Sequence, residues 1–171
     1  WTPRFLKNSM LIETLPGHAL HVLPKPDLLL FGAGGHARVV ADAALCSEQW
    51  GAVQASDRNA EVCTGELLSG VPRVRLADLA SVEGLAGALH VSIGNNLSRQ
   101  CEALVLGLER LVTVVHPKAS VSPYSNVAAG CFLAAQCVVA PGVQLGSCVI
   151  INHAAVVDHD VCVGAFSHIA P

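Results

Sequence analysis

The sequence predicts a half-size α/β domain followed by a parallel β-helix. Near residue 30, a glycine loop lies between an apolar run and a helical pattern, as in nucleotide-binding α/β units. From residue 115 onward, a branched aliphatic residue recurs at every sixth position, which is the period of a hexapeptide β-helix. The composition agrees, because only 4% of the residues are aromatic and the core must be filled by Val, Leu, Ile and Ala.

The composition also excludes several functional classes. A net charge of −3 argues against a nucleic-acid-binding surface or a polybasic membrane patch. No apolar run reaches the roughly 18 residues that a membrane-spanning helix needs. The seven cysteines include no CxxC pair, so we expect reduced thiols in a cytoplasmic protein, without a zinc ribbon or a disulfide framework.

We expect three segments along the chain. Residues 1–27 contain several prolines and lack a continuous apolar stretch, so we interpret them as a leader of unknown role rather than a signal peptide. Residues 28–114 are predicted to form the α/β domain, and residues 115–171 the β-helix.

The α/β domain is predicted to begin with a buried strand, Leu28–Phe31, and a helix over residues 36–45. Between them, Gly32, Gly34 and Ala37 match the pattern G-x-G-x-x-G/A. In this pattern the backbone turns tightly and approaches a phosphate at the helix N-terminus.

The rest of this domain is expected to alternate between strands and helices. Asp57 is the candidate acidic residue after a second strand, although it comes a few positions late. The stretch ALHVSIGNN reads as a strand that ends at Gly94 and Asn95, and a helix over residues 97–108 follows. RLVTVVH is then expected to be a strand that runs straight into the first coil. This alternation is too short for a full dinucleotide fold and suits a half-size parallel sheet.

The repeat can be followed in ten steps of six residues. The positions are Val115, Val121, Val127, Leu133, Val139, Leu145, Ile151, Val157, Val163 and Ile169. These side chains are expected to point inward and to stack on each other in about three coils of three strands. Cys131 and Cys137 fall on a second inward position that holds small residues, so we expect both to be core residues.

Four stretches carry a resemblance to a known family: FGAGGHARVVADA, SIGNNLSR, VHPKASVSPYS and IINHAAVVDHDVCVGAFSHIAP. Over about residues 28–171 the chain resembles the bacterial sugar O-acyltransferases, which include NeuD-type sialic acid O-acetyltransferases and PglD-type nucleotide-sugar N-acetyltransferases. The resemblance implies a Rossmann-like N-terminal half-domain, a left-handed parallel β-helix, and a homotrimer with acetyl-CoA bound between neighbouring subunits. It further implies acetyl transfer, without a metal, to an amine or hydroxyl of a sugar or nucleotide-sugar in bacterial surface glycan synthesis.

The resemblance also implies roles for individual residues. His159 matches the general base and Asp160 the acidic residue that orients it, while His168 matches a histidine near the acetyl-CoA thioester. The residues expected to bind the acceptor are Gly32, Gly34, Gly35, His36, Asp57, Gly94, Asn95 and Asn152.

The residues themselves are consistent with the role implied for His159. An imidazole with a pKa near 7 can take the proton of an attacking amine or hydroxyl, and a carboxylate beside it fixes its tautomer. Asp158 could be this partner instead of Asp160. The repeat places His168 in the last position of its hexad, which we expect to be a corner.

Two alternatives stay open. His153, His159 and His168 could hold a zinc ion between subunits, as in γ-type carbonic anhydrases, although such an enzyme has no use for the glycine loop. The hexad that begins at Ile169 has only three residues and no cap follows it. We therefore expect a truncated form of a longer acetyltransferase, a β-helix with little turnover of its own.

Overall fold

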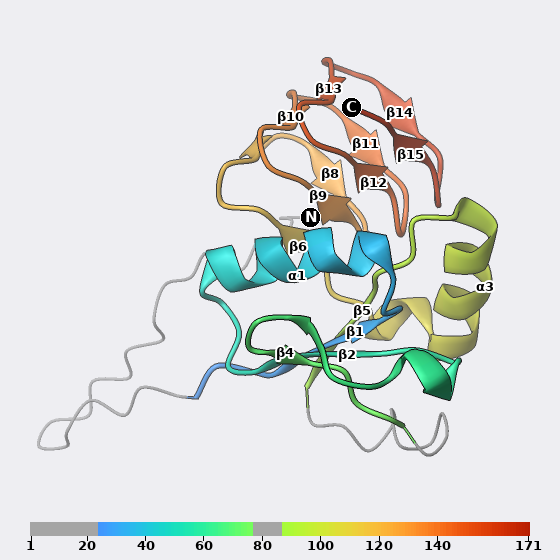
Figure 1. The fold of residues 1–171 in the computed structure, drawn as a ribbon. Coiled ribbons are helices and arrows are strands. Elements are labelled where there is room, and N and C mark those ends of the chain that lie inside the picture. Colours follow the sequence, from blue (N-terminus) through green and yellow to red (C-terminus); the bar gives the residue numbers. More distant parts are fainter. Residues whose placement is uncertain (1–23, 77–86) are drawn as a thin grey trace, which may run out of the picture.

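The computed structural model describes residues 24–76 and 87–171, so most of the predicted leader lies outside the described residues. A small α/β part and a β-helix lie against each other, with helix α1 (Gly35–Ser47) between them (Figure 1). No helix in the described ranges is long and apolar enough to cross a membrane.

The front part is built on a parallel sheet with the strand order β2-β1-β5. Its strands are β1 (Leu28–Phe31), β2 (Val53–Ser56) and β5 (Ala88–Val91). The predicted limits of β1 are confirmed, and all four of its residues are buried. A short 3-10 turn, η1 (Ala60–Val62), and an antiparallel hairpin of β3 (Glu66–Leu68) and β4 (Val71–Pro72) follow β2 in the chain.

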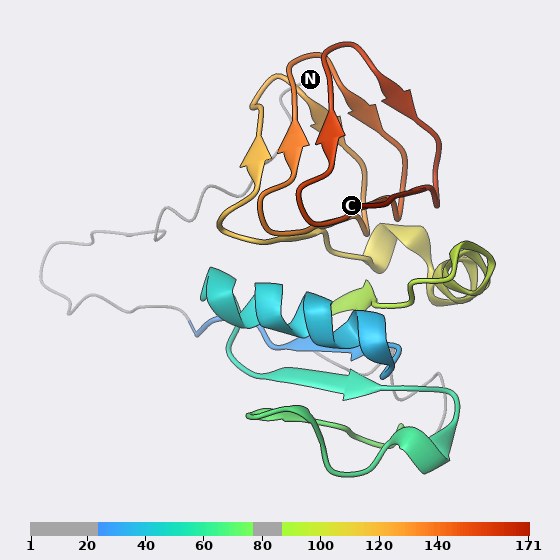
Figure 2. The ribbon, with the colours of Figure 1, turned by 45° about the horizontal axis from the view of Figure 1, so that its top comes forward.

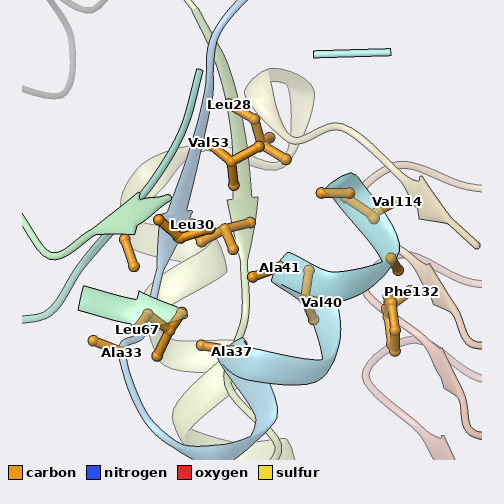
Figure 3. Close-up of a cluster of buried hydrophobic side chains, with 14 of the residues drawn as sticks. Leu28, Leu30, Ala33, Ala37, Val40, Ala41, Val53, Leu67, Val114 and Phe132 are labelled. Atoms are coloured by element: carbon orange, nitrogen blue, oxygen red, sulfur yellow. The ribbon is translucent and has the colours of Figure 1, made fainter. Parts of the chain in front are cut away.

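Helix α1 is sandwiched between the front sheet and the β-helix (Figure 2). Its buried residues are Ala37, Val40, Ala41, Ala43 and Ala44. They belong to one apolar cluster together with Leu30 of the sheet and Val114 and Phe132 of the β-helix (Figure 3). Small side chains allow both neighbours to approach the helix closely, so a single core joins the two parts.

The connection between the two parts departs from the prediction. After α3 (Asn96–Leu106) and the 3-10 turn η2 (Leu108–Arg110), RLVTVVH is not one strand. Leu111 forms a bridge to Leu89 of β5, whereas β6 (Val114–Val115) pairs with the β-helix. Thr113 lies at the change of sheet, where its Oγ1 donates to the Ala128 carbonyl and accepts from the Cys131 N–H. The threonine hydroxyl thus supplies hydrogen bonds that a continuous strand would have made.

The β-helix consists of two-residue strands joined by tight turns. They are β7 (Ser120–Val121), β8 (Asn126–Val127), β9 (Phe132–Leu133), β10 (Val138–Val139), β11 (Gln144–Leu145), β12 (Ile150–Ile151), β13 (Val156–Val157), β14 (Cys162–Val163) and β15 (His168–Ile169). They form three parallel sheets, in the orders β13-β10-β7, β14-β11-β8 and β15-β12-β9-β6. The architecture is the expected left-handed parallel β-helix.

The interior of the β-helix confirms the six-residue repeat. Five of the ten predicted inward aliphatic residues form one buried cluster, and the other five, nearer the two ends, are partly buried and pack against it. Cys131 and Cys137 are fully buried in it, as expected. Burial raises the pKa of Cys131 to about 12 and that of Cys137 to about 11, so both side chains stay thiols at neutral pH.

His168 does not lie at a corner. It is the first residue of β15, in register with Ile150 of β12, which in turn pairs with Phe132 of β9. Each strand combines the last position of one hexad with the first of the next, so the turns fall in between, as at residues 165–166. Because successive side chains of a strand point to opposite faces and Ile169 points inward, His168 points outward, from the sheet that packs on α1.

Candidate active site

The glycine loop lies at the carboxyl ends of the front strands. Gly32 follows β1 with a φ of 113°, a conformation that favours glycine, and a Cβ there would lie 2.7 Å from Ile93 Cγ1. Asp57 directly follows β2, and its Oδ2 accepts a hydrogen bond of 3.1 Å from the Ala33 N–H. Asp57 therefore does not come late, because β2 ends at Ser56. The loop and the acidic residue are brought together as predicted.

The two helices that follow these strands differ at their N-termini. Gly34 is the N-cap residue of α1 and makes no side-chain cap, and a Cβ at Gly34 or Gly35 would meet no atom within 4 Å. By contrast, Asn95 caps α3, because its Oδ1 accepts a 3.0 Å hydrogen bond from the Ser98 N–H. The open end of α1 can receive an anion such as a phosphate, whereas Asn95 already has a structural role.

His36, in the first turn of α1, contacts the β-helix. Its ring meets Phe132 edge-on with centroids 5.4 Å apart, and the His168 centroid lies 6.4 Å away. A Cβ on Gly94 would lie 3.4 Å from the His36 Cβ. Burial, with a smaller effect of His90, lowers the pKa of His36 to about 4, so the ring is neutral at neutral pH. Its Nε2 atom is buried and has no hydrogen-bond partner within the described residues.

Asn152 and His168 share a hydrogen bond on the outer surface of the β-helix. The Asn152 Oδ1 accepts from the His153 N–H, which directs its Nδ2 group to the His168 Nε2 at 3.1 Å. The proton of the neutral His168 ring therefore lies on Nδ1. Burial lowers the pKa of His168, and the charge of Arg99 adds to the effect. We call His36, Asn152 and His168 the interface group.

Arg99 is a further residue at this interface, and the sequence analysis did not single it out. Its side chain is almost completely buried and donates to the carbonyls of Ile93 and Gly94 in the front part. It also donates to the carbonyls of Cys148 and Phe166 in two turns of the β-helix. Because Arg99 shares the buried face of α3 with small and apolar residues, its spacing on that face was the signal that could have found it.

His159 and Asp160 lie in an exposed turn between β13 and β14. His159 Nδ1 is 2.8 Å from Asp160 Oδ2, and a carboxylate only accepts, so the proton lies on Nδ1 and Nε2 is free. The hydrogen bond to Asp160, followed by the charge of Asp158, raises the pKa of His159. The two side chains keep 71% and 81% of their surface, so a substrate or a partner can reach Nε2. We call His159 and Asp160 the corner pair.

The turn one hexad earlier distinguishes the two neighbouring carboxylates. The N–H of His153 donates to the preceding asparagine side chain, just as that of His159 donates to Asp158 at 2.7 Å. Asp158 thus holds the turn backbone. The following residue is Ala154 in one turn and Asp160 in the other, so Asp160 is the hydrogen-bond partner of the ring.

The interface group and the corner pair do not meet within one chain. His168 and the strand before Asn152 belong to the sheet β15-β12-β9-β6, which packs on α1. The turn between β13 and β14, which carries the corner pair, joins the other two sheets and lies away from α1 (Figure 1). An active site that used both would take them from different copies of the chain.

Within the described residues, one group of side chains lies close enough together to bind a metal ion, and it contains none of the three histidines of the zinc alternative. Asp42, Cys46 and His116 have ligand atoms within 4.8 Å of one another. However, His116 Nδ1 accepts from the Lys118 N–H, so the neutral ring carries its proton on Nε2, whereas a metal-bound histidine donates from its second nitrogen. The three histidines of the zinc alternative form no such group within the described part of one chain.

Comparisons with known proteins agree with the observed fold. Residues 27–102 match the model of the PglD N-terminal domain family. The acetyltransferase domain of PglB from Neisseria gonorrhoeae FA1090 is 34% identical with a TM-score of 0.73, over 85% of this chain and 71% of that one. A GDP-perosamine N-acetyltransferase from Caulobacter crescentus is 30% identical with a TM-score of 0.73, over 83% of this chain and 67% of that one. No curated protein sequence matches the chain.

Proposed function

The chain belongs to the NeuD/PglD-type family of sugar acetyltransferases, and we propose that its acceptor is a nucleotide-linked sugar with a free amine or hydroxyl. The similar PglB domain was solved with acetyl coenzyme A, and the similar Caulobacter crescentus enzyme with CoA and GDP-perosamine. Acetyl-CoA is the proposed acetyl donor, and the proposed setting is the cytoplasmic synthesis of bacterial surface glycans.

The observation that carries the proposal is the free Nε2 of His159 beside the carboxylate-held Nδ1. Nε2 would take the proton of the acceptor nitrogen or oxygen while that atom forms a bond to the thioester carbonyl carbon. The carbon–sulfur bond then breaks, and the proton passes from Nε2 to the leaving sulfur. Asp160 would stabilise the imidazolium that forms in between.

The glycine loop, His36 and Asn152 are assigned to the acceptor, and His168 is assigned to the thioester of acetyl-CoA. The open N-terminus of α1 at Gly34 and Gly35 would receive the phosphates of the nucleotide. His36, in the first turn of this helix, would border the sugar together with His168, whose ring centroid lies 6.4 Å away. His168 carries its proton on Nδ1 and can donate it to the carbonyl oxygen of the thioester, which supports the role that the family resemblance implies.

We propose a homotrimer in which the corner pair of one subunit faces the interface group of the next. The separation of the two groups within one chain supports this arrangement. Val156 and Val161, on either side of the corner pair, keep 64% and 40% exposure, which suits contact with a neighbouring subunit or with the stem of acetyl-CoA. Closed symmetric assembly would create each composite site once per interface.

Coenzyme A release with a panel of GDP- and UDP-linked amino sugars tests the proposal. His159→Ala is expected to lower kcat by about 100-fold or more with the best acceptor. His153→Ala is the matched control, because it removes a histidine at the same turn position one hexad earlier, and we expect less than about a twofold change. An active His159→Ala enzyme would contradict the assigned base. If the wild-type protein releases no coenzyme A with any acceptor and instead hydrates carbon dioxide only with bound zinc, the carbonic anhydrase alternative is correct.

A further inference from the structure

The turns of the β-helix share a residue with positive φ, and the glycine at one of these positions needs a separate explanation. Between residues 130 and 166, a residue with positive φ recurs at every sixth position. The series is Gly130, Gln136, Gly142, Cys148, Ala154, Asp160 and Phe166, with φ values from 55° to 78°. Because five of these seven positions carry a side chain, the positive φ alone does not explain the glycine at position 142.

The space above Gly142 explains why it has no side chain. Asp160 lies one coil further on, and its N–H donates to the Pro141 carbonyl at 3.2 Å. A Cβ on Gly142 would overlap Asp160 Oδ1 and would lie 3.3 Å from Asp160 Cγ. The other carboxylate oxygen, Oδ2, holds His159 Nδ1 at 2.8 Å. The carboxylate therefore occupies the volume that any side chain at position 142 would take.

The other positions of the series show that only at Gly142 does a carboxylate of the corner pair fill the space above. The second glycine, Gly130, lies beneath Cys148, and a Cβ there would meet the Cys148 Sγ at 2.7 Å, which is a matter of core packing. Gln136 lies beneath Ala154, whose N–H donates to the carbonyl of residue 135, and both carry side chains in the left-handed conformation. A side chain is thus tolerated at these positive-φ positions wherever the residue one coil above leaves room for it.

We infer that Gly142 is a positioning residue for acetyl transfer: by lacking a side chain, it lets the Asp160 carboxylate lie against His159. The inference rests on the proposed function, since it gives His159 the role of base. The titratable groups that act on His159 are Asp160 and Asp158, and the coil beneath presents Pro141 and Gly142 there. The adjacent Tyr124 contributes its backbone carbonyl, which accepts from the Gly142 N–H.

A double-mutant cycle on the full-length protein tests the inference. Gly142→Ala should lower kcat/KM by about tenfold in the wild-type background but by less than about twofold in an Asp160→Asn background, because the carboxylate that it displaces is then already lost. The acidic limb of its pH–rate profile should move to lower pH, as the carboxylate raises the pKa of His159. Gln136→Ala is the control, since it places alanine at the equivalent positive-φ position of the preceding turn and should leave rate and pH profile unchanged.

Two results would overturn the inference. One is an equal loss from Gly142→Ala in both backgrounds, and the other is a Gly142→Ala enzyme with the wild-type rate and pH profile. The Gly142→Ala protein should keep its thermal midpoint within a few degrees, because only the end of a flexible side chain must move. Activity in His159→Ala would instead reject the proposed function, so the two failures are distinguishable.

Discussion

The interface group and the corner pair both rely on histidine, but their surroundings shift the imidazole pKa in opposite directions. Burial between α1 and the β-helix lowers the pKa of His36 to about 4. The hydrogen bond to Asp160 raises the pKa of the exposed His159. A buried ring that stays neutral suits binding through neutral hydrogen bonds, whereas an exposed ring with a carboxylate partner suits proton transfer. This difference supports our proposal that the corner pair transfers the proton and that the interface group positions the acceptor and the thioester carbonyl.

The largest expected effect is a loss of folding stability, which we expect at the interface group and not at the corner pair. Arg99→Met would leave the carbonyls of Gly94, Cys148 and Phe166 without their donor, at a cost of about 3 kcal/mol in the free energy of unfolding. Chemical denaturation measures this change. Arg58→Met is the control on neighbouring structure, because the Arg58–Glu102 ion pair is half exposed and contributes less than about 1 kcal/mol.

A second variant of Arg99 sharpens the comparison in an activity assay. Arg99 contacts the interface but not the corner pair, so Arg99→Lys, which keeps the charge, should raise the KM for the acceptor while the acidic limb of the pH profile stays in place. A shift of that limb in Arg99→Lys would show that the two regions are not independent.

The next effect concerns the pH dependence of the corner pair. In the proposed mechanism neutral His159 takes the acceptor proton, so kcat/KM should fall as the pH drops below the pKa of this ring, which Asp160 holds above its ordinary value. Asp160→Asn removes that stabilisation of the imidazolium and should move the acidic limb to lower pH, with about a tenfold loss of kcat.

Asp158→Asn is the control for this pH prediction. Asp158 accepts from the His159 backbone and not from its ring, so the shift of the limb should be smaller than in Asp160→Asn. A limb that stays in place in Asp160→Asn, or that moves equally in both variants, would contradict the assignment of Asp160 as the partner of the base.

Much of the fold was predictable because its signals are local and periodic. The ten aliphatic steps of the β-helix and the glycine loop between β1 and α1 depend only on spacing in the chain. The position of His168 was not predicted correctly, because a period fixes the spacing of the turns but not where each strand begins within the hexad.

The unpredicted features depend on stacking between segments far apart in the sequence. Arg99 is explained only when the turns at Cys148 and Phe166 lie beside the front domain. Gly142 is explained only when Asp160 lies one coil above it. The sequence predicted a base and an acceptor site, but it did not predict that one chain places them at opposite sides of the β-helix.

Mixed assemblies of two inactive variants test most directly whether the active site joins the two regions across subunits. His159→Ala chains would be coexpressed with chains that carry His36→Ala, Asn152→Ala and His168→Ala, and coenzyme A release by the purified assemblies would be measured. If the corner pair of one subunit serves the interface group of the next, about a quarter of the interfaces in an equal mixture combine two intact halves, and about that share of wild-type activity should return. Activity no higher than that of the two parent variants would show that each site is built within a single chain and would contradict the account.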